Sequence, residues 1–547
     1  MYRRRSVLAP RGLVTSPHAL ATAAGLRALQ GGGNAVEAAI AAAATIAVVY
    51  PHMNGLGGDN IWLIYDASAQ QVRALLACGT AGSGCTIDAY RAAGHAETIP
   101  RRGPLAANTV PGVVDGWAEA YRYSREHMRG RLPFASLLDD ALYYAEAGFP
   151  VTAHQAAWTG ARIGPDSGPF GHLEHLEGWR RTFLRPDGSA YGAGERFTSP
   201  DLAATLRAIA RGGRDAFYRG PIAARICTVL RERGGVLQDT DFAAYRCRWA
   251  DPLTLGYREW TVCNTPPPTQ GLTSLEILNI VEHFPLAAWG GESPDYYHVL
   301  VEAAKQAFAD RDDWIADPDY TSVPVPDLLS KTRGRAQAAA ITFDRAVAPE
   351  SAARPAPGDT VFLAAVDVDG NAVSLIQSIY FDFGSAVVAE GTGVLLQNRG
   401  SAFSLDPADL NVLAPGKRPF TTLNPALALR DGRPVLVYGA MGGEGQPQTQ
   451  AAILTRVLDL GMDVQAAIDG PRWLYGRTWG EPTTALSLES RVPPHVVDDL
   501  RRRGHDVRVV GPWDDLMGHA QAIWIDRRTG TRCGGADPRG DGIAAGY

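Results

Sequence analysis

The sequence predicts a layered α/β sandwich, in which β-strands are covered by helices on both sides. Helical periodicity dominates the chain up to about residue 245, whereas alternating apolar and polar segments typical of strands become frequent after about residue 250. Because helical segments frame the strands along the chain, we expect the two kinds of element to pack as separate layers.

The first part of the chain supplies most of the predicted helices. Residues 15–50 contain two helical segments, HALATAAGLRALQ and AVEAAIAAAATIAVV, separated by the helix-breaking run Gly31-Gly32-Gly33-Asn34. The second segment is too short to cross a bilayer and is predicted to be a buried helix. The alternating IWLIYD that follows is predicted to be a strand, and residues 106–155 are predicted to hold further helices.

The later part of the chain supplies most of the predicted strands. Residues 251–264 alternate like a strand, and the block TVFLAAVDVDGNAVSLIQSI contains two strands joined by a turn at DVDGN. Residues 336–357 are rich in Ala, Pro and Arg and are predicted to form an exposed connector. Another strand pair, in PALALRDGRPVLVYGAMGG, and the helix AAILTRVLDLG follow.

Composition favours an enzyme that acts on a small molecule. With 547 residues, 46% of them hydrophobic, the chain can bury a large core. Its formal net charge of -6 offers no excess of positive charge to attract nucleic acid or an anionic membrane. The six cysteines lack metal-ligand spacing, and we expect neither a metal nor an organic cofactor. No apolar segment of signal-peptide length begins the chain, which favours a cytoplasmic location; a homo-oligomer stays open.

Thr360 stands between the predicted connector and a predicted buried strand. Cleavage of the bond between Asp359 and Thr360 would place an α-amine, whose usual pKa is about 8, beside the threonine hydroxyl. Such an amine can act as general base for the hydroxyl, which is the N-terminal threonine form of nucleophilic catalysis. Threonine is also a good strand former, and the local sequence by itself favours that simpler interpretation.

Two glycine-rich turns differ in what they predict. The turn AMGGEG at 440–445 follows a strand and precedes a helix, so its amides can converge on an anion as an oxyanion hole requires. The turn GLGGD at 55–59 lacks both the Gly-Lys-Ser/Thr ending and the G-x-G-x-x-G spacing, so it does not predict nucleotide binding.

Five colinear segments, spread over nearly the whole chain, carry a family resemblance. They are GGNAVEAAIAAAATIAVVYPHMNGLGGDNIWLIYD, NTVPGVVDGW, YHVLVEAAKQAFADR, DTVFLAAVDVDGNAVSLIQS and GAMGGEGQPQ. Together they resemble the γ-glutamyltranspeptidase family of N-terminal nucleophile hydrolases. The resemblance implies a four-layer αββα sandwich made from one precursor. The precursor would cleave itself into a large subunit, residues 1–359, and a small subunit, residues 360–547, that form one composite domain.

The resemblance also implies catalytic roles. Thr360 would attack the carbonyl of Asp359 during self-cleavage and would then attack substrate amides as the new N-terminus. Ser378 matches a second hydroxyl residue that hydrogen-bonds the amine of the nucleophile and assists processing. Gly442 and Gly443 match the pair whose amides form the oxyanion hole.

The substrate-binding positions depart from the family pattern. The family's arginine for an α-carboxylate is absent from the matching stretch at residues 78–82, and its Asn two residues after the second hydroxyl is Tyr380. Its Gln and Asp that receive an amino group are Arg399 and Ala402, and its Ser-Ser pair is Thr421-Thr422. A cation at Arg399 would repel an ammonium group and attract an anion.

Four segments, QSIYFDFGS, LLQNRGSAFSLDP, GAMGGEGQPQTQ and LYGRTWG, together resemble the oxamate amidohydrolase branch of the family. They predict hydrolysis of a small amide acid such as oxamate through an acyl-enzyme on Thr360. Arg399, Thr421 and Thr422 would bind the substrate carboxylate, and Tyr380 would form a pocket wall or donate a hydrogen bond. Arg399 could instead be a surface arginine, or pair with a carboxylate such as Asp382.

Two other functions stay open: a γ-glutamyl hydrolase or transferase that acts on glutathione, and an unprocessed, non-catalytic binding protein. His52 is expected to be a packed, hydrogen-bonded histidine, and Lys305 and Asp310 are expected to hold their helix to its neighbours.

Overall fold

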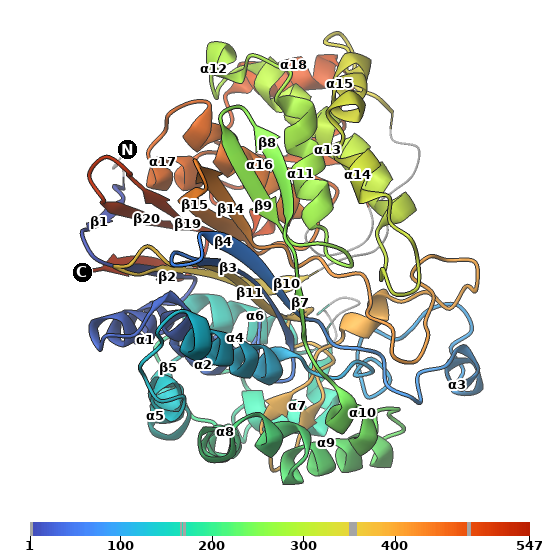
Figure 1. Cartoon of the computed structure of the whole chain (residues 1–547). Coiled ribbons are helices and arrows are strands. Elements are labelled where there is room, and N and C mark those ends of the chain that lie inside the picture. The colour runs from blue at the N-terminus through green and yellow to red at the C-terminus, as the bar shows by residue number, and fades with distance from the viewer. Residues whose placement is uncertain (1–3, 165–166, 168–170, 349–357, 478–482) are drawn as a thin grey trace.

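Two seven-stranded sheets, each with antiparallel pairing throughout, lie face to face at the centre of the molecule (Figure 1). The computed structural model describes residues 4–164, 167, 171–348, 358–477 and 483–547. The first sheet has the order β1 (Val7–Ala9), β20 (Arg532–Ala536), β19 (Ala520–Ile525), β15 (Arg433–Ala440), β14 (Ala426–Arg430), β9 (Trp260–Asn264) and β8 (Leu253–Tyr257). The second has the order β21 (Ile543–Gly546), β2 (Leu13–Ser16), β10 (Asp359–Val366), β11 (Ala372–Tyr380), β3 (Asp59–Asp66), β4 (Gln71–Ala77) and β7 (Arg248–Ala250).

Helices cover the outer face of each sheet, so the chain folds as four layers (Figure 1). The helices above the first sheet include α11 (Gly271–Val281), α13 (Pro294–Trp314), α16 (Gly445–Leu458), α17 (Val464–Asp469) and α18 (Pro494–Arg502). Those below the second include α1 (Ala19–Gln30), α2 (Ala35–Val49), α4 (Val113–His127), α5 (Asp139–Ala147) and α8 (Pro200–Tyr218). Between the sheets, inward-facing side chains such as Phe362, Ile376, Leu427 and Val437 form a separate apolar layer. The predicted αββα sandwich is confirmed.

The central hairpin of the second sheet begins at the predicted nucleophile. Strands β10 and β11 are joined at the DVDGN turn, where Gly370 adopts a φ of 88° that favours glycine. The carboxylate of Asp367 accepts hydrogen bonds from the amides of Asp369 and Asn371, at 3.0 Å each. Both strands are buried along their whole length, because α2 covers one face and the first sheet covers the other.

Helix α2 forms where the sequence predicts it. Asn34 and Glu37 make a capping box at its first turn, and every residue from Ala35 to Val49 is buried. A helix that is apolar on all sides is stable only when it is covered on all sides, and here the second sheet and the helices α1, α4 and α5 cover it.

Two predicted boundaries are wrong. Residues 251–264 form a hairpin of two strands, because Arg258 turns the chain with a φ of 54°. The connector is shorter than predicted, since residues 336–340 continue helix α15 (Lys331–Ala340). The ion pair between Arg333 and Asp310, at 2.5 Å, ties that helix to α13. Residues 349–357 of the predicted connector lie outside the described residues.

Helix α13 also holds the segment of chain after α15. The ammonium of Lys305 donates hydrogen bonds to Glu302 at 2.7 Å and to the carbonyl of Val347 at 2.9 Å. The expectation that Lys305 and Asp310 hold this helix to its neighbours is therefore confirmed.

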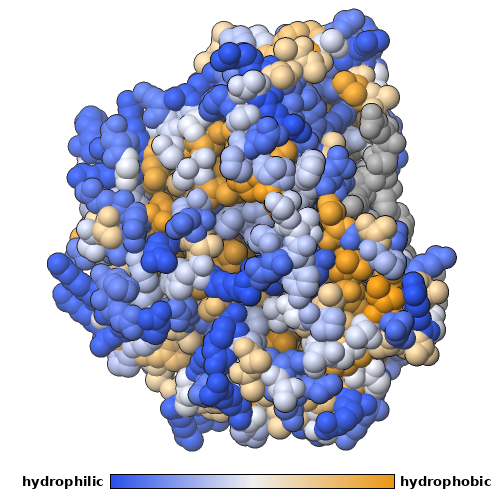
Figure 2. Space-filling view, turned by 45° about the vertical axis from the view of Figure 1, so that its right-hand side comes forward, coloured by the Kyte–Doolittle hydropathy of each residue, from blue (hydrophilic) through white to orange (hydrophobic). Residues whose placement is uncertain are grey.

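Among the described residues, no helix combines the length and the apolar character that a membrane crossing requires. Figure 2 shows a face on which hydrophilic residues predominate, with hydrophobic side chains gathered in patches at its centre and right.

Candidate active site

Thr360 lies in the middle of the second sheet, one residue after the start of β10. It is fully buried, and its hydroxyl oxygen Oγ1 has no hydrogen-bond partner among the described residues. Most buried polar atoms in proteins are paired, so an unpaired hydroxyl at this place calls for a functional explanation.

A bulge aims Ser378 at the bond before Thr360. The register of β10 and β11 shifts between Asp359, which faces Tyr380, and Val361, which faces Gln377, leaving one extra residue on β11. The Ser378 hydroxyl donates a hydrogen bond of 2.7 Å to the carbonyl oxygen of Asp359 and accepts one of 2.8 Å from the amide of Tyr380. Tyr380 itself has a φ of 81°, a strained conformation for a tyrosine.

The glycine pair predicted to form the oxyanion hole lies at the turn from β15 into α16. Gly442 and Gly443 have φ values of 131° and 50°, which only glycine adopts readily. Neither amide donates a hydrogen bond to any described residue. The side chain of Gln270 fixes the turn, because its Nε2 donates to the carbonyls of Gly443 and Thr422, at 2.8 Å each.

Gly358, the residue before Asp359, lies close to two of these groups. A Cβ atom added to Gly358 would lie 3.4 Å from Cα of Gly443 and 3.4 Å from Oγ1 of Thr422. The Thr422 Oγ1 atom is buried and, within the described part of the chain, has no hydrogen-bond partner. Ser378, Gly443 and Thr422, far apart in sequence, thus all lie next to the chain at residues 358–360.

Arg399 lies near this centre, at the start of the short 3-10 helix η3 (Arg399–Ala402). Its Nε donates to Asp59 at 3.0 Å, and its Nη1 donates to the hydroxyl of Thr421 at 2.9 Å. The guanidinium lies 5.1 Å from the centre of the Tyr380 ring. Its Nη2 is buried and has no partner among the residues that the structure describes.

The carboxylate partner of Arg399 is Asp59, and the suggested pairing with Asp382 is wrong. Asp382 is held by Arg102 at 3.2 Å and by Arg162. Arg399 and Asp59 are both completely buried. Burial raises the pKa of Asp59 to about 6, although the Arg399 charge and hydrogen bonds from Gln397, Gly79 and Gly112 act in the opposite direction.

Sequence reasoning missed Asp59 and Gln270 as parts of this centre. Asp59 is the last residue of the turn GLGGD, and Gln270 lies in the turn PPPTQG, and both turns are recognisable in the sequence. In the first turn, Gly58 packs so closely that an added Cβ would lie 2.2 Å from the carbonyl oxygen of Ser378. The glycines there serve close backbone packing beside the centre, which agrees with the absence of a nucleotide-binding motif.

Asp359 is almost completely buried. Burial raises the pKa of its side-chain carboxyl well above the usual range, and the negative charges of Asp382 and Asp515 raise it further. The nearby charges of Arg162 and Arg102 act in the opposite direction, but burial has the larger effect and favours the neutral form of this carboxyl.

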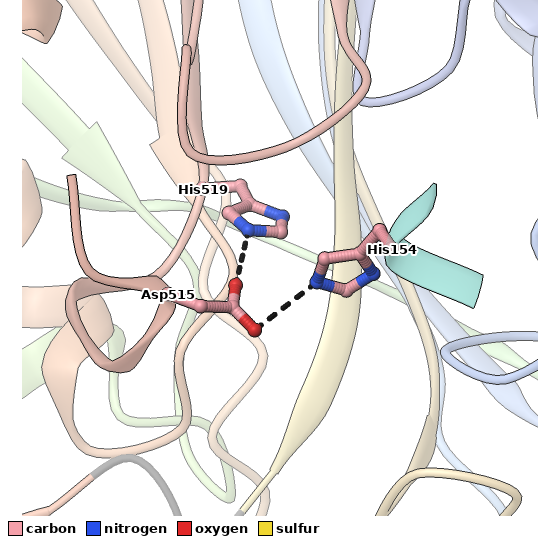
Figure 3. A group of neighbouring side chains, drawn as sticks. All are labelled: His154, Asp515 and His519. Carbon is pink, nitrogen blue, oxygen red and sulfur yellow. Dashed lines mark hydrogen bonds and ion pairs between the residues drawn. The ribbon is translucent and has the colours of Figure 1, made fainter. Parts of the chain in front are cut away.

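His154, Asp515 and His519 form a cluster (Figure 3) that is linked to the glycine turn through the backbone of His519. Asp515, in the short helix η4 (Asp515–Met517), lies between two imidazoles and accepts from His519 at 2.5 Å and from His154, in helix α6 (Ala153–Gly160), at 3.1 Å. Burial alone would raise the pKa of Asp515, but the two histidines hold it below its usual range. The backbone amide of Met441 donates a hydrogen bond of 2.9 Å to the carbonyl of His519, and this bond joins the cluster to the glycine turn.

His52 belongs to the same network and is, as expected, a packed and hydrogen-bonded histidine. Its Nε2 lies 2.8 Å from Nδ1 of His154, and it is fully buried. Burial lowers its pKa well below the usual value, so the ring is neutral.

Within the described ranges, two groups of side chains have the donor atoms of a cation site. They are His154, Asp515 and His519, and His298, Glu302 and His505; within each group the donor atoms lie within 4.8 Å of one another. In the first group, however, the indole N–H of Trp158 lies 3.1 Å from both His154 Nε2 and Asp515 Oδ2. A cation between those two atoms would meet this donor, so the group is better explained as an ion-pair network that braces the glycine turn.

Residues 21–547 match the γ-glutamyltranspeptidase family. The chain belongs to this family. Among curated members, an oxamate amidohydrolase proenzyme from Klebsiella pneumoniae is 48% identical over 99% of both chains. A glutathione hydrolase-like YwrD proenzyme from Bacillus subtilis is 45% identical over the same shares. The solved structure of a cephalosporin acylase from Bacillus halodurans superposes with a TM-score of 0.90 at 37% identity, over 100% of this chain and 98% of that one.

Family membership and the αββα fold identify the chain as an amidohydrolase proenzyme of the N-terminal nucleophile type. The resemblance seen in the sequence is confirmed. The interpretation as a non-catalytic binding protein does not agree with this membership.

Proposed function

We propose that this family member cleaves itself between Asp359 and Thr360 and then hydrolyses a small amide acid such as oxamate. The observation that carries the proposal is a group of unpaired buried polar atoms at and near residues 358–360. Thr360 Oγ1, Thr422 Oγ1 and Arg399 Nη2 have no partner among the described residues. Thr422 lies next to Gly358, and Arg399 donates a hydrogen bond to the adjacent Thr421.

In self-cleavage, Thr360 Oγ1 attacks the carbonyl carbon of Asp359. The hydrogen bond from Ser378 polarises that carbonyl and stabilises the negative charge that develops on its oxygen. The C–N bond breaks, the proton of the hydroxyl passes to the departing amine, and the resulting ester is hydrolysed by water. Residues 1–359 then form the large subunit, and residues 360–547 form the small subunit with Thr360 at its N-terminus.

In substrate hydrolysis, the new α-amine accepts the proton of Oγ1 as this oxygen attacks the amide carbon. The amides of Gly442 and Gly443 donate to the oxyanion. The C–N bond breaks with proton transfer to the leaving nitrogen, and water then hydrolyses the acyl-enzyme. Oxamate would give oxalate and ammonia by this route.

The charge around Arg399 favours a carboxylate without a neighbouring amino group. Arg399 Nη2 and the hydroxyls of Thr421 and Thr422 can bind a carboxylate, while Ala402 offers no acceptor to an ammonium group. A γ-glutamyl substrate carries both groups and fits less well, although a glutathione hydrolase is the alternative to test.

Two measurements test this function. Purified enzyme is incubated with oxamate and with glutathione, and released ammonia and glutamate are measured; release of glutamate without ammonia would reject the oxamate-like substrate. The variant Thr360→Ala should stay a single chain of 58.4 kDa on a denaturing gel and lose all activity, because alanine has no hydroxyl to attack either bond.

A further inference from the structure

A cavity of about 650 Å³ opens beside the candidate active site. Tyr380 and Ala402 form part of its wall, and the carbonyl of Tyr380 lies 3.6 Å from the position of a Cβ on Gly358. Tyr380 therefore belongs both to the wall of the cavity and to the surroundings of residue 358, two positions before Thr360. Oxamate has only six non-hydrogen atoms, so a cavity of this volume has room for a much larger amide.

Arg311, in helix α13, lies in the wall of this cavity and is only 2% exposed. Its Nε donates to Asp312 at 2.8 Å, but among the described residues neither Nη1 nor Nη2 has a hydrogen-bond partner. Burying a guanidinium with two unpaired nitrogen atoms is costly, and an anion that accepts from both would remove that cost.

Aromatic rings hold the Arg311 guanidinium in place. It lies 4.4 Å from the centre of the Phe308 ring and 5.8 Å from that of Phe420, which also lines the cavity. Because two rings and Asp312 already fix the side chain, little conformational entropy is lost when a ligand binds to it.

Resting on the proposed function, we infer that Arg311 forms a second anion subsite and that the enzyme acts on amides whose amine portion carries a carboxylate. Arg399, whose guanidinium lies 5.1 Å from the centre of the Tyr380 ring, serves the acyl portion. Arg311 serves the portion that departs into the cavity. The substrate class is an N-acyl amino acid in which both halves are anionic.

The test compares two oxamates that differ in one charge. N-carboxymethyl oxamate carries a carboxylate on its amine portion, and N-propyl oxamate is an uncharged analogue of similar size. Processed wild-type enzyme should bind and hydrolyse the charged compound with a lower KM, by about tenfold or more, as expected for a charge-assisted hydrogen bond. Equal KM values of the two compounds on the processed wild-type enzyme would overturn the inference.

Variants assign the effect to Arg311. Arg311→Met should raise the KM of N-carboxymethyl oxamate and leave those of oxamate and N-propyl oxamate within about twofold, whereas Arg311→Lys should retain part of the preference. Arg333→Met, an arginine of the neighbouring helix outside the cavity wall, is the matched control and should leave the preference unchanged. An equal loss on all three compounds in Arg311→Met would show a structural role instead.

Failure of the proposed function gives a different result. In that case the processed enzyme releases no oxalate from oxamate or from either of its two N-substituted derivatives. The same single-charge comparison is then made with γ-glutamylglycine and γ-glutamylpropylamide, and a preference for the charged member that Arg311→Met removes still supports the subsite. The absence of a preference in this pair as well would reject it.

Discussion

Asp359 shows how a single buried carboxyl can make the uncut chain sensitive to pH. Its pKa is raised in the folded state by burial, Asp382 and Asp515, so the folded chain retains a proton that the unfolded chain releases at its usual pKa of about 4. The free energy of unfolding therefore includes a contribution from the neutral Asp359 carboxyl at low pH. This contribution is lost as pH rises above about 4.

The variant Asp359→Asn should remove this loss of stability at higher pH, because asparagine carries no group that ionises. We expect Asp359→Asn/Thr360→Ala to be more stable than Thr360→Ala at neutral pH, with a difference that shrinks as pH falls towards 4. Urea denaturation of the two uncut chains at several pH values measures it. A difference in unfolding free energy that stays constant with pH would contradict the prediction.

Arg399 has two roles in the proposed active site. It is placed to bind substrate, yet it also neutralises Asp59, and neither side chain is exposed to solvent. Removal of one member of a buried ion pair costs about 3–5 kcal/mol, because the other charge is left without a partner. We therefore expect Arg399→Ala to lose stability as well as substrate binding.

Chemical denaturation tests this expectation. Arg399→Ala should lower the free energy of unfolding by about 3 kcal/mol or more, and Asp59→Asn/Arg399→Ala should recover much of the loss because the buried charge is gone. Wild-type stability of Arg399→Ala would contradict the prediction and leave Arg399 as a substrate-binding residue only.

At the scale of single residues, the sequence predicted which side chains gather but not how they are paired. The colinear motifs identified Thr360, Ser378, the glycine pair and Arg399 as candidates. The partner of Arg399 could not be predicted, because 340 positions separate it from Asp59 and several other carboxylates were available. The φ of Tyr380 and the bulge beside it depend on the register of two strands, which no local pattern specifies.

At the scale of elements, prediction succeeded where periodicity was strong and flanked by clear breaks. Helices α1 and α2 and the hairpin β10–β11 agree closely with their predicted limits, because Asn34 and the DVDGN turn mark the boundaries chemically. Prediction failed where the boundary depends on tertiary contacts. The turn at Arg258 carries no glycine, and the first turn of α15 is tied to α13 by an ion pair that the sequence of α15 does not reveal.

At the scale of the whole molecule, the two predicted subunits are interleaved in both sheets. In the first sheet, β1, β8 and β9 come from residues 1–359, while β14, β15, β19 and β20 come from the rest. In the second, β10 and β11 lie between β2 and β3, so the strand that begins with Thr360 and its hairpin partner are bordered on both sides by the other subunit.

Cleavage before Thr360 should therefore leave the molecule in one piece. Separating the subunits would break backbone pairing at β1–β20, β9–β14, β2–β10, β3–β11 and β2–β21, and would expose the apolar layer between the sheets. We expect both fragments to co-elute on native size exclusion and to unfold in a single transition, while a denaturing gel separates them. Elution of the small fragment by itself under native conditions would contradict this, because its strands would then lack the neighbours that complete both sheets.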